Sequence, residues 1–310
     1  MGSPSPDRVV AAGRASRAGV VAVLVAVVGW SLTNLILKIT KAPAVTFAFY
    51  RLWGGAIVML IVAPLAGRRV TWAMIKASAP GGVLFGANIV LFFTALKATS
   101  VADVLVIQAL QPALILMVAG SLFGERITRW DVNWTVVSVV GVVLVTVGSS
   151  GTPVWSLRGD VLAVGSLLAW TAYFLVSKGV RRAVPAVEYM TTVTLVAAIV
   201  VTPVALVSGE RLGGLRWQDW GWLGVFLLAA QGGHVLLAWA HGQVDVSVSA
   251  LLILAQPIIA TVAAFFVLGE PLTGLEVAGG LVVILAVAAI VRRATRIAEP
   301  DPEAAPSSGT

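Results

Sequence analysis

Residues Leu254 to Glu270 read LAQPIIATVAAFFVLGE, an apolar run that nevertheless contains Gln256 and Pro257. A bilayer-spanning helix normally avoids both an amide and a helix breaker at its centre. The same pattern occurs earlier, as QALQPALILMVAGSLFGE from Gln108 to Glu125. In each copy eleven residues separate the Gln-Pro pair from a Gly-Glu pair, and the copies lie 145 positions apart. This spacing indicates that the chain contains two related halves.

The composition is that of an integral membrane protein. Of the 310 residues 59% are hydrophobic and only 11% are charged, against about 25% charged residues in soluble domains. Ten apolar runs are long enough, at roughly 17 to 25 residues, to cross a bilayer as helices. We therefore expect an all-α integral membrane protein with ten transmembrane helices. The predicted spans are Ala18–Leu37, Ala44–Ala66, Pro80–Ala98, Val101–Phe123, Trp130–Val147, Asp160–Ser177, Ala186–Ser208, Trp220–Ala240, Val246–Leu268 and Leu275–Val291.

The repeat continues outside the two Gln-Pro segments. Thr128 and Asp131 correspond to Thr273 and Glu276, and Trp30 and Lys38 are matched by Trp170 and Lys178. Each half holds five spans, an odd number, so the second half is predicted to be inverted relative to the first, as in many secondary transporters. The predicted organisation is a cytoplasmic tail 1–17, a first repeat 18–148, a linker 149–159, a second repeat 160–291 and a C-terminal tail 292–310.

The net charge of +7 is read as a topology signal. Most Lys and Arg residues fall on one side of the predicted spans, among them Arg68, Arg69, Arg181, Arg182, Arg292 and Arg293. By the positive-inside rule both termini are cytoplasmic. We expect a multi-pass protein of the bacterial inner membrane, with the lipid bilayer as a partner and no nucleic-acid surface.

Enzymatic chemistry has little support in the sequence. The chain has no cysteine and two histidines. His234 and His241 lie seven positions apart, about 10.5 Å along a helix, so they cannot share a metal ion. Nucleophile motifs and phosphate-binding loops are lacking as well. We therefore expect no enzyme activity, no metal and no cofactor.

The two prolines are predicted to interrupt their helices. Pro112 and Pro257 cannot donate a backbone hydrogen bond, which frees the carbonyls of Gln108 and Ile253. In lipid, freed carbonyls need a partner from a neighbouring helix, a side chain or cavity water. One interpretation is a kinked helix whose polar groups are satisfied internally. The other is a broken helix that lines a polar cavity.

Other polar and aromatic residues lie at similar depth and suggest a small-molecule cavity. The candidate substrate-binding residues are Trp30, Asn34, Asn88, Gln108, Gln111, Trp170, Tyr173, Gln231, His234 and Gln256. Arg51 is a charge inside the second span; it could snorkel to the outer surface, pair with carbonyls or attract an anionic substrate group. If transport is coupled to protons, His234 and Asp103 are the candidate proton sites.

At these residues the chain resembles the EamA-type transporters of the drug/metabolite transporter superfamily. The resemblance rests on GWSLTNLILK at 29–38, PAVTFAFYRLWGG at 43–55, AWTAYFLVSK at 169–178 and the two Gln-Pro segments. It implies a ten-helix carrier of small metabolites, often an exporter of amino acids or related solutes. It also implies that the first, third, fourth, sixth, eighth and ninth spans surround the cavity, with the fifth and tenth peripheral. Lys38 and Arg51 match recurrent basic positions, although the second half has no counterpart of Arg51.

The expected function is therefore secondary transport, by alternating access, of a small metabolite such as an amino acid, in the direction of export. A multidrug or toxic-compound exporter of the same fold is an alternative. A passive channel or a membrane sensor is an alternative of another class. The expected partner is a small-molecule substrate, and the chain is expected to act as a monomer or homodimer.

Overall fold

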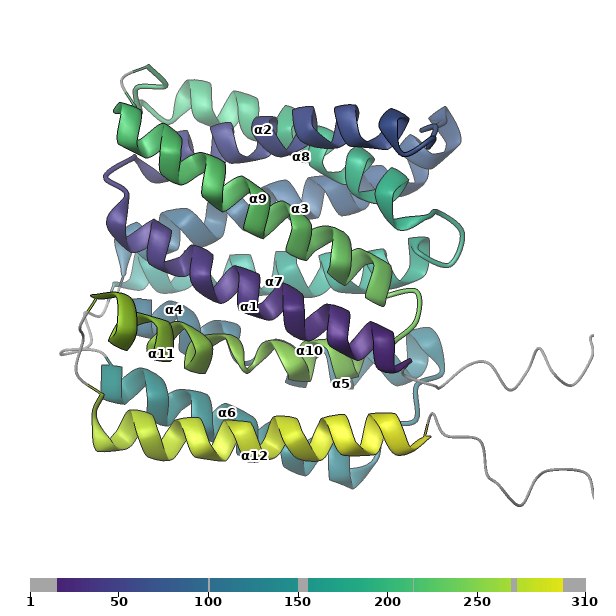
Figure 1. The fold of residues 1–310 in the computed structure, drawn as a ribbon, viewed down its shortest axis with the longest axis vertical. Coiled ribbons are helices and arrows are strands. Elements are labelled where there is room, and N and C mark those ends of the chain that lie inside the picture. The colour runs from purple at the N-terminus through teal and green to yellow at the C-terminus, as the bar shows by residue number, and fades with distance from the viewer. Residues whose placement is uncertain (1–15, 100, 150–155, 214, 269–271, 298–310) are drawn as a thin grey trace, which may run out of the picture.

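The computed structural model describes residues 16–99, 101–149, 156–213, 215–268 and 272–297. The regular structure in these segments is helical (Figure 1). The helices are α1 (Arg17–Ile39), α2 (Ala44–Leu65), α3 (Trp72–Ala98), α4 (Val101–Gln108), α5 (Gln111–Phe123), α6 (Arg129–Ser149), α7 (Leu157–Val180), α8 (Ala186–Val207), α9 (Trp217–Ala240), α10 (Val246–Ile253), α11 (Gln256–Leu268) and α12 (Gly274–Ile297).

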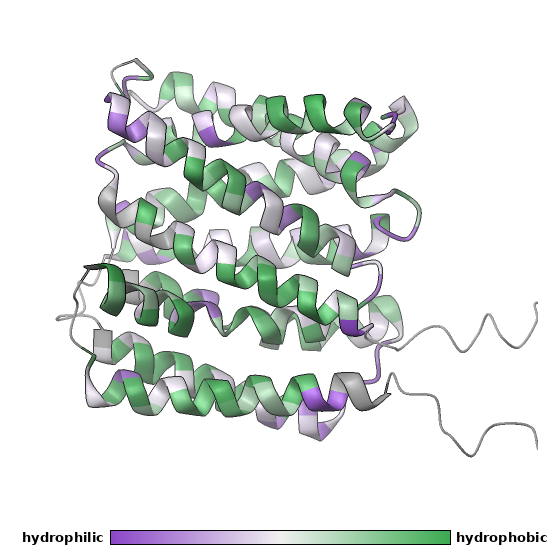
Figure 2. Ribbon diagram, in the orientation of Figure 1, coloured by the Kyte–Doolittle hydropathy of each residue, from purple (hydrophilic) through white to green (hydrophobic). Residues whose placement is uncertain are grey.

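These helices form the ten predicted spans. Among the described residues, nine helical segments are long and apolar enough to cross a membrane, when α4 with α5 and α10 with α11 are each counted as one span. α1 corresponds to the tenth predicted span; its apolar stretch, Arg17–Thr33, is shorter than those of the other nine. Hydrophobic residues colour most of the bundle, and hydrophilic residues concentrate at the loops and helix ends (Figure 2). The predicted fold class is confirmed.

Several helices begin or end beyond the predicted bounds. α3 begins at Trp72 rather than Pro80, because Thr71 caps it by accepting a hydrogen bond from Met74 N at 3.3 Å. α7 begins at Leu157 rather than Asp160, after the capping residue Ser156. The end of the predicted linker 149–159 is therefore helical. Caps, which are polar, fix these ends, whereas hydropathy locates only the apolar centre of each helix.

Both Gln-Pro pairs start a new helix. α4 ends at Gln108 and α5 begins at Gln111, while α10 ends at Ile253 and α11 begins at Gln256. Proline is tolerated in the first turn of a helix, where its missing N–H needs no partner. α5 ends at Phe123 and is capped by Gly124, whose φ of 72° is the left-handed conformation that glycine favours at a helix terminus. The equivalent Gly269 lies outside the described residues.

The two halves of the chain interleave. In Figure 1, α6 and α12 form one edge of the stack and α2 and α8 form the opposite edge. The most extensive contacts join α3 to α7 and α8, α1 to α9, α2 to α8, and α6 to α12. Each of these pairs takes one helix from each half. The end of the bundle where α1 begins and α12 ends is called the tail end below, and the opposite end the far end.

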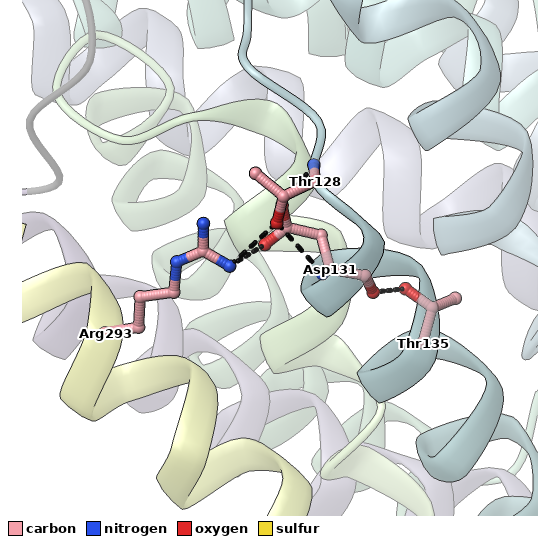
Figure 3. A network of polar contacts seen from close by, with 4 residues as sticks. All are labelled: Thr128, Asp131, Thr135 and Arg293. Carbon is pink, nitrogen blue, oxygen red and sulfur yellow. Dashed lines mark hydrogen bonds and ion pairs between the residues drawn. The ribbon is translucent and has the colours of Figure 1, made fainter.

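The peripheral pair α6 and α12 is fastened by a polar network at the tail end (Figure 3). Thr128 N donates to Asp131 Oδ2 at 2.7 Å, and Asp131 N donates to Thr128 Oγ1 at 3.4 Å, which is a capping box. Arg293 of α12 donates to Thr128 Oγ1 at 2.9 Å and to Asp131 Oδ1 at 3.1 Å. The two helices are thereby held together at a distance from the centre of the bundle.

Candidate functional site

A cavity of about 140 Å³ lies between the two halves, with both helix breaks in its wall. Eight residues singled out in the sequence line it: Trp30, Arg51, Asn88, Gln108, Gln111, Trp170, His234 and Gln256. Residues that the sequence did not suggest complete the wall, notably Phe92, Phe93 and Phe226. α6 and α12 contribute nothing to the described wall, as the family resemblance implies. α2, which is the second span, contributes Arg51, although the resemblance does not place that span at the cavity.

The remaining candidates lie elsewhere. Tyr173 is fully buried and Gln231 is 7% exposed, and neither lines the cavity. Gln231 faces α2, because a Cβ built on Gly55 would lie 2.7 Å from its Oε1. The side chains of Asn34 and Asp103 lie outside the described part of the structure.

The cavity extends from mid-bundle toward the far end. α1 runs from the tail end to the far end, and Thr33 lies in its second half. α4 and α9 begin at the far end, and Leu105 and Phe226 lie in their early turns. Toward the tail end, side chains that are fully buried fill the space, including Tyr173, Phe174 and Tyr189. The cavity is therefore closed by packing on the tail side.

Arg51 and His234 form the charged part of the wall. Both are 5% exposed, and the Arg51 Nη2–His234 Nε2 distance is 2.8 Å. Because a guanidinium can only donate, Nε2 must accept, and the imidazole is the neutral tautomer with its proton on Nδ1. The guanidinium also lies 5.2 Å from the ring centroid of Phe85 and 5.7 Å from that of Phe226. Arg51 points into the bundle, so it does not snorkel to the outer surface.

The amides around the first helix break differ in their partners. Ser166 of α7 accepts hydrogen bonds at Oγ from Asn88 Nδ2 and from Gln108 Nε2, each at 2.9 Å. Gln111 is 2% exposed, and its Nε2 finds no acceptor among the described residues. At the second break the backbone carbonyl of Gln256 accepts from Ser31 Oγ at 3.1 Å. The helices are thus broken and line a cavity, and the unpaired Gln111 amide belongs to its wall.

Aromatic side chains surround His234. The ring centroid of Trp30 lies 4.7 Å from that of His234 and 6.0 Å from that of Trp170. Trp170 in turn stacks on Tyr173, with centroids 5.1 Å apart. Trp30 Nε1 donates to the carbonyl of Ala230 at 3.3 Å, so the indole lies across α9. It can do so because position 233 is glycine: a Cβ there would lie 2.7 Å from Nε1.

Comparison with known proteins agrees with this architecture. The profile of the EamA-like transporter family matches residues 17–147 and 157–292, nearly the whole chain. The chain belongs to the EamA-like transporter family. This EamA-like protein is therefore a multi-pass membrane transporter of the drug/metabolite transporter superfamily, and the resemblance seen in the sequence is confirmed.

Two individual proteins are similar to this EamA-like transporter. The uncharacterized transporter YwfM of Bacillus subtilis (strain 168) is 27% identical over 272 residues, which covers 81% of this chain and 86% of that protein. A solved structure, described only as a crystal structure of a protein, superposes with a TM-score of 0.73 at 19% identity. The superposition covers 91% of this chain and 99% of the chain in the solved structure, and this likeness supports the fold alone.

At the tail end of the EamA-like bundle, Glu125 of the first half caps a helix of the second. Its carboxylate accepts from Val246 N at 2.8 Å, from Ser247 N at 3.3 Å and from Ser247 Oγ at 2.6 Å. These are the first amides of α10, and the negative charge also suits the positive end of that helix. Burial raises the pKa of Glu125, although its hydrogen bond to Ser247 opposes this shift.

Further contacts surround this cap. Lys178 donates to the carbonyl of Val244, and His241 Nδ1 lies 2.9 Å from Ser177 Oγ. Burial, with the charges of Lys178 and Arg181, lowers the pKa of His241 to about 3, so its imidazole is neutral. The contact between Glu125 and α10 was not predicted from the sequence, because the helix that Glu125 caps lies about 120 residues further along the chain.

Proposed function

We propose that this protein is a secondary transporter that exports a small metabolite, an amino acid or a related solute, by alternating access. The observation that carries the proposal is the cavity at both helix breaks, which is lined by residues of both inverted halves and has the fully buried side chains of Tyr173, Phe174 and Tyr189 on its tail side. Two halves of similar structure can exchange these roles, which yields a second state that is open at the tail end. The proposal assigns the chain no catalytic role.

The positive-inside distribution supports placing the tail end in the cytoplasm of a bacterial cell, with the far end outside. We assign the described conformation to the outward-facing side of the transport cycle, because the residues that line the cavity lie between mid-bundle and the far end. For an exporter this is the state that releases the solute, and the return to the inward-facing state would separate α10 from the first half. Glu125 would then leave the first amides of α10. Hydrogen bonds to a charged group are worth about 1.5 to 3 kcal/mol each, so this contact can act as a lock at the tail end.

The size of the cavity favours small solutes over drug-sized molecules. Pockets that enclose drugs usually measure about 300 to 1,000 Å³, whereas this cavity measures about 140 Å³. A multidrug exporter is for this reason the weaker alternative. A passive channel is also less favoured, because the packed tail end and the duplicated halves are features of a carrier.

Counterflow in proteoliposomes tests the proposal. Purified protein would be reconstituted with a high internal concentration of an unlabelled amino acid, and entry of the same amino acid in labelled form would be followed for each of the twenty. Accumulation that saturates with external concentration and that requires internal substrate is expected of a carrier. Flux that is linear in concentration and independent of internal solute would refute alternating access and favour a channel.

A further inference from the structure

Arg51 is a buried positive charge that the described protein does not neutralise. It forms no ion pair with any carboxylate of the described residues, and its nearest polar partner, His234, is neutral. Its Nε, although buried, has no acceptor in the described part of the chain. A charge in a membrane interior is expensive unless it is paired or serves function. A ligand that brought a negative charge to Arg51 would supply the missing partner.

The surroundings of Arg51 fix its direction and leave it at the cavity. His234 holds Nη2, and the faces of Phe85 and Phe226 lie on the guanidinium at cation–π distances. The guanidinium is thus oriented before any ligand binds, which lowers the entropy that binding must overcome. Arg51 is also the one cation among the residues that line the described cavity, and no Asp or Glu is among them.

The rest of the described wall is aromatic or neutral. Trp30, Trp170, Phe92, Phe93 and Phe226 provide apolar faces, and Gln111 provides an unpaired amide. The volume of about 140 Å³ is close to that of an engineered apolar cavity of about 150 Å³ that binds benzene. An apolar group of the size of one ring therefore fits beside Arg51.

We propose that the transported solute is a small carboxylic acid with an apolar body, and that Arg51 binds its carboxylate. This inference rests on the proposed transport function and names the substrate class. A guanidinium matches the planar geometry of a carboxylate with two parallel hydrogen bonds, which favours this head group over a neutral one. Amines without an acid group are excluded, because the described wall gives an ammonium no counter-charge and Arg51 repels it.

The test compares ligands that share a body and differ in their head group. Phenylacetate, phenylalanine, phenylacetamide and phenethylamine form one series; isovalerate, leucine, isovaleramide and isoamylamine form an aliphatic one. Binding to the purified full-length protein is measured by calorimetry and by thermal stabilisation, since a ligand that binds only the folded state raises stability. In at least one series the acid or the amino acid should bind roughly tenfold or more tightly than the amide.

Three variants locate the effect. Arg51→Gln should abolish the preference for the acid while leaving amide binding unchanged. Arg51→Lys keeps the positive charge but lacks the planar guanidinium that donates two parallel hydrogen bonds, so it should retain only part of the preference for the acid over the amide. Lys97→Gln is the control, because it removes one positive charge from the exposed surface of α3. If Arg51→Gln fails to fold, the preference of the wild type and its reduction in Arg51→Lys decide.

The inference is overturned if neither series shows a preference for the acid, or if well-folded Arg51→Gln keeps it. Counterflow separates this failure from failure of the transport proposal. Saturable counterflow of an amide or amine, without that of the acids, would support alternating-access transport and refute a carboxylic acid as the substrate. Tight binding of an acid through Arg51 without any saturable counterflow would support carboxylate binding and refute transport by alternating access.

Discussion

Gly233 and Gly232 are neighbours in α9 that differ in what an added methyl group would meet. At Gly233 a Cβ would lie 2.7 Å from Trp30 Nε1, whereas at Gly232 nothing lies within 4 Å. An ordinary van der Waals contact begins near 3.4 Å, so in Gly233→Ala the indole must retreat by about 0.7 Å. It is confined, since Trp30 is 7% exposed and packs against Trp170 and His234.

The adjacent variant isolates this clash. Replacing a glycine inside a helix by alanine gains up to about 1 kcal/mol of helix propensity at either position. Overpacking a buried site costs about 1 to 3 kcal/mol, and only Gly233→Ala incurs it. Gly233→Ala should therefore be about 1 to 3 kcal/mol less stable than Gly232→Ala. It should also weaken solute binding, because Trp30 lines the cavity.

Thermal unfolding of both purified variants in the same detergent measures the difference. A change of 1 kcal/mol shifts the melting temperature by about 2 to 4 °C in proteins of 150 to 250 residues, so a gap of several degrees is expected. In a Trp30→Phe background, which removes Nε1, the penalty for the Gly233 methyl group should shrink. If Gly233→Ala melts at or above Gly232→Ala, Trp30 is not confined and the described cavity wall is wrong.

The remaining predictions concern other contacts of the bundle. In Gly279→Ala the new Cβ would meet the backbone of α6, 2.6 Å from the carbonyl oxygen of Gly141, so thermal stability should fall by about 1 to 3 kcal/mol. Gly280→Ala makes only an ordinary contact and should not lose stability; equal melting of the two would contradict the close packing. Because burial raises the pKa of Glu125, ionising this residue costs more in the folded than in the unfolded chain. The wild type should therefore lose stability relative to Glu125→Gln as the pH rises from below 4.5 through the raised pKa. Melting temperatures of both proteins at about pH 4 and pH 8 measure this change. A wild type that instead gains stability relative to the variant at the higher pH would mean that the capping hydrogen bonds outweigh burial. Gln111→Leu removes an amide whose Nε2 has no acceptor among the described residues, so stability should hold while solute binding weakens about tenfold. Unchanged counterflow would make Gln111 a structural residue only.

The fold could be predicted from the sequence because membrane-spanning helices are selected by length and apolarity. The predicted spans Val101–Phe123 and Val246–Leu268 have the observed outer bounds of α4 with α5 and of α10 with α11. Prediction was poorest where polar residues belong to a helix. Lys76 lies in the first turns of α3, and the apolar pattern alone placed the start eight residues too late. The helix there begins because Thr71 caps it, a local hydrogen bond that hydropathy does not register.

The site could be predicted only in its composition. Polar and aromatic residues at mid-membrane depth pointed to half of the lining residues, because polar residues are rare in lipid without a function. Which face of α9 meets the cavity depends on its packing against α1 and α8, and in this structure His234 lines the cavity whereas Gln231 does not. Tyr173 lies one turn closer to the tail end than Trp170, and it does not line the cavity. The Arg51–His234 contact joins residues 183 positions apart, and no local pattern indicates it.

The interleaving of the halves has a consequence for biosynthesis. When the first half has been inserted into the membrane, α1, α2 and α3 still lack α9, α8 and α7, the helices against which they pack most extensively. Each half is thus a topological unit but not an autonomous folding unit. The nascent first half must either wait in the bilayer or pair temporarily with another copy. Cutting the chain at 150–155 should therefore produce two fragments that are each short-lived when made alone and that restore one another when made together.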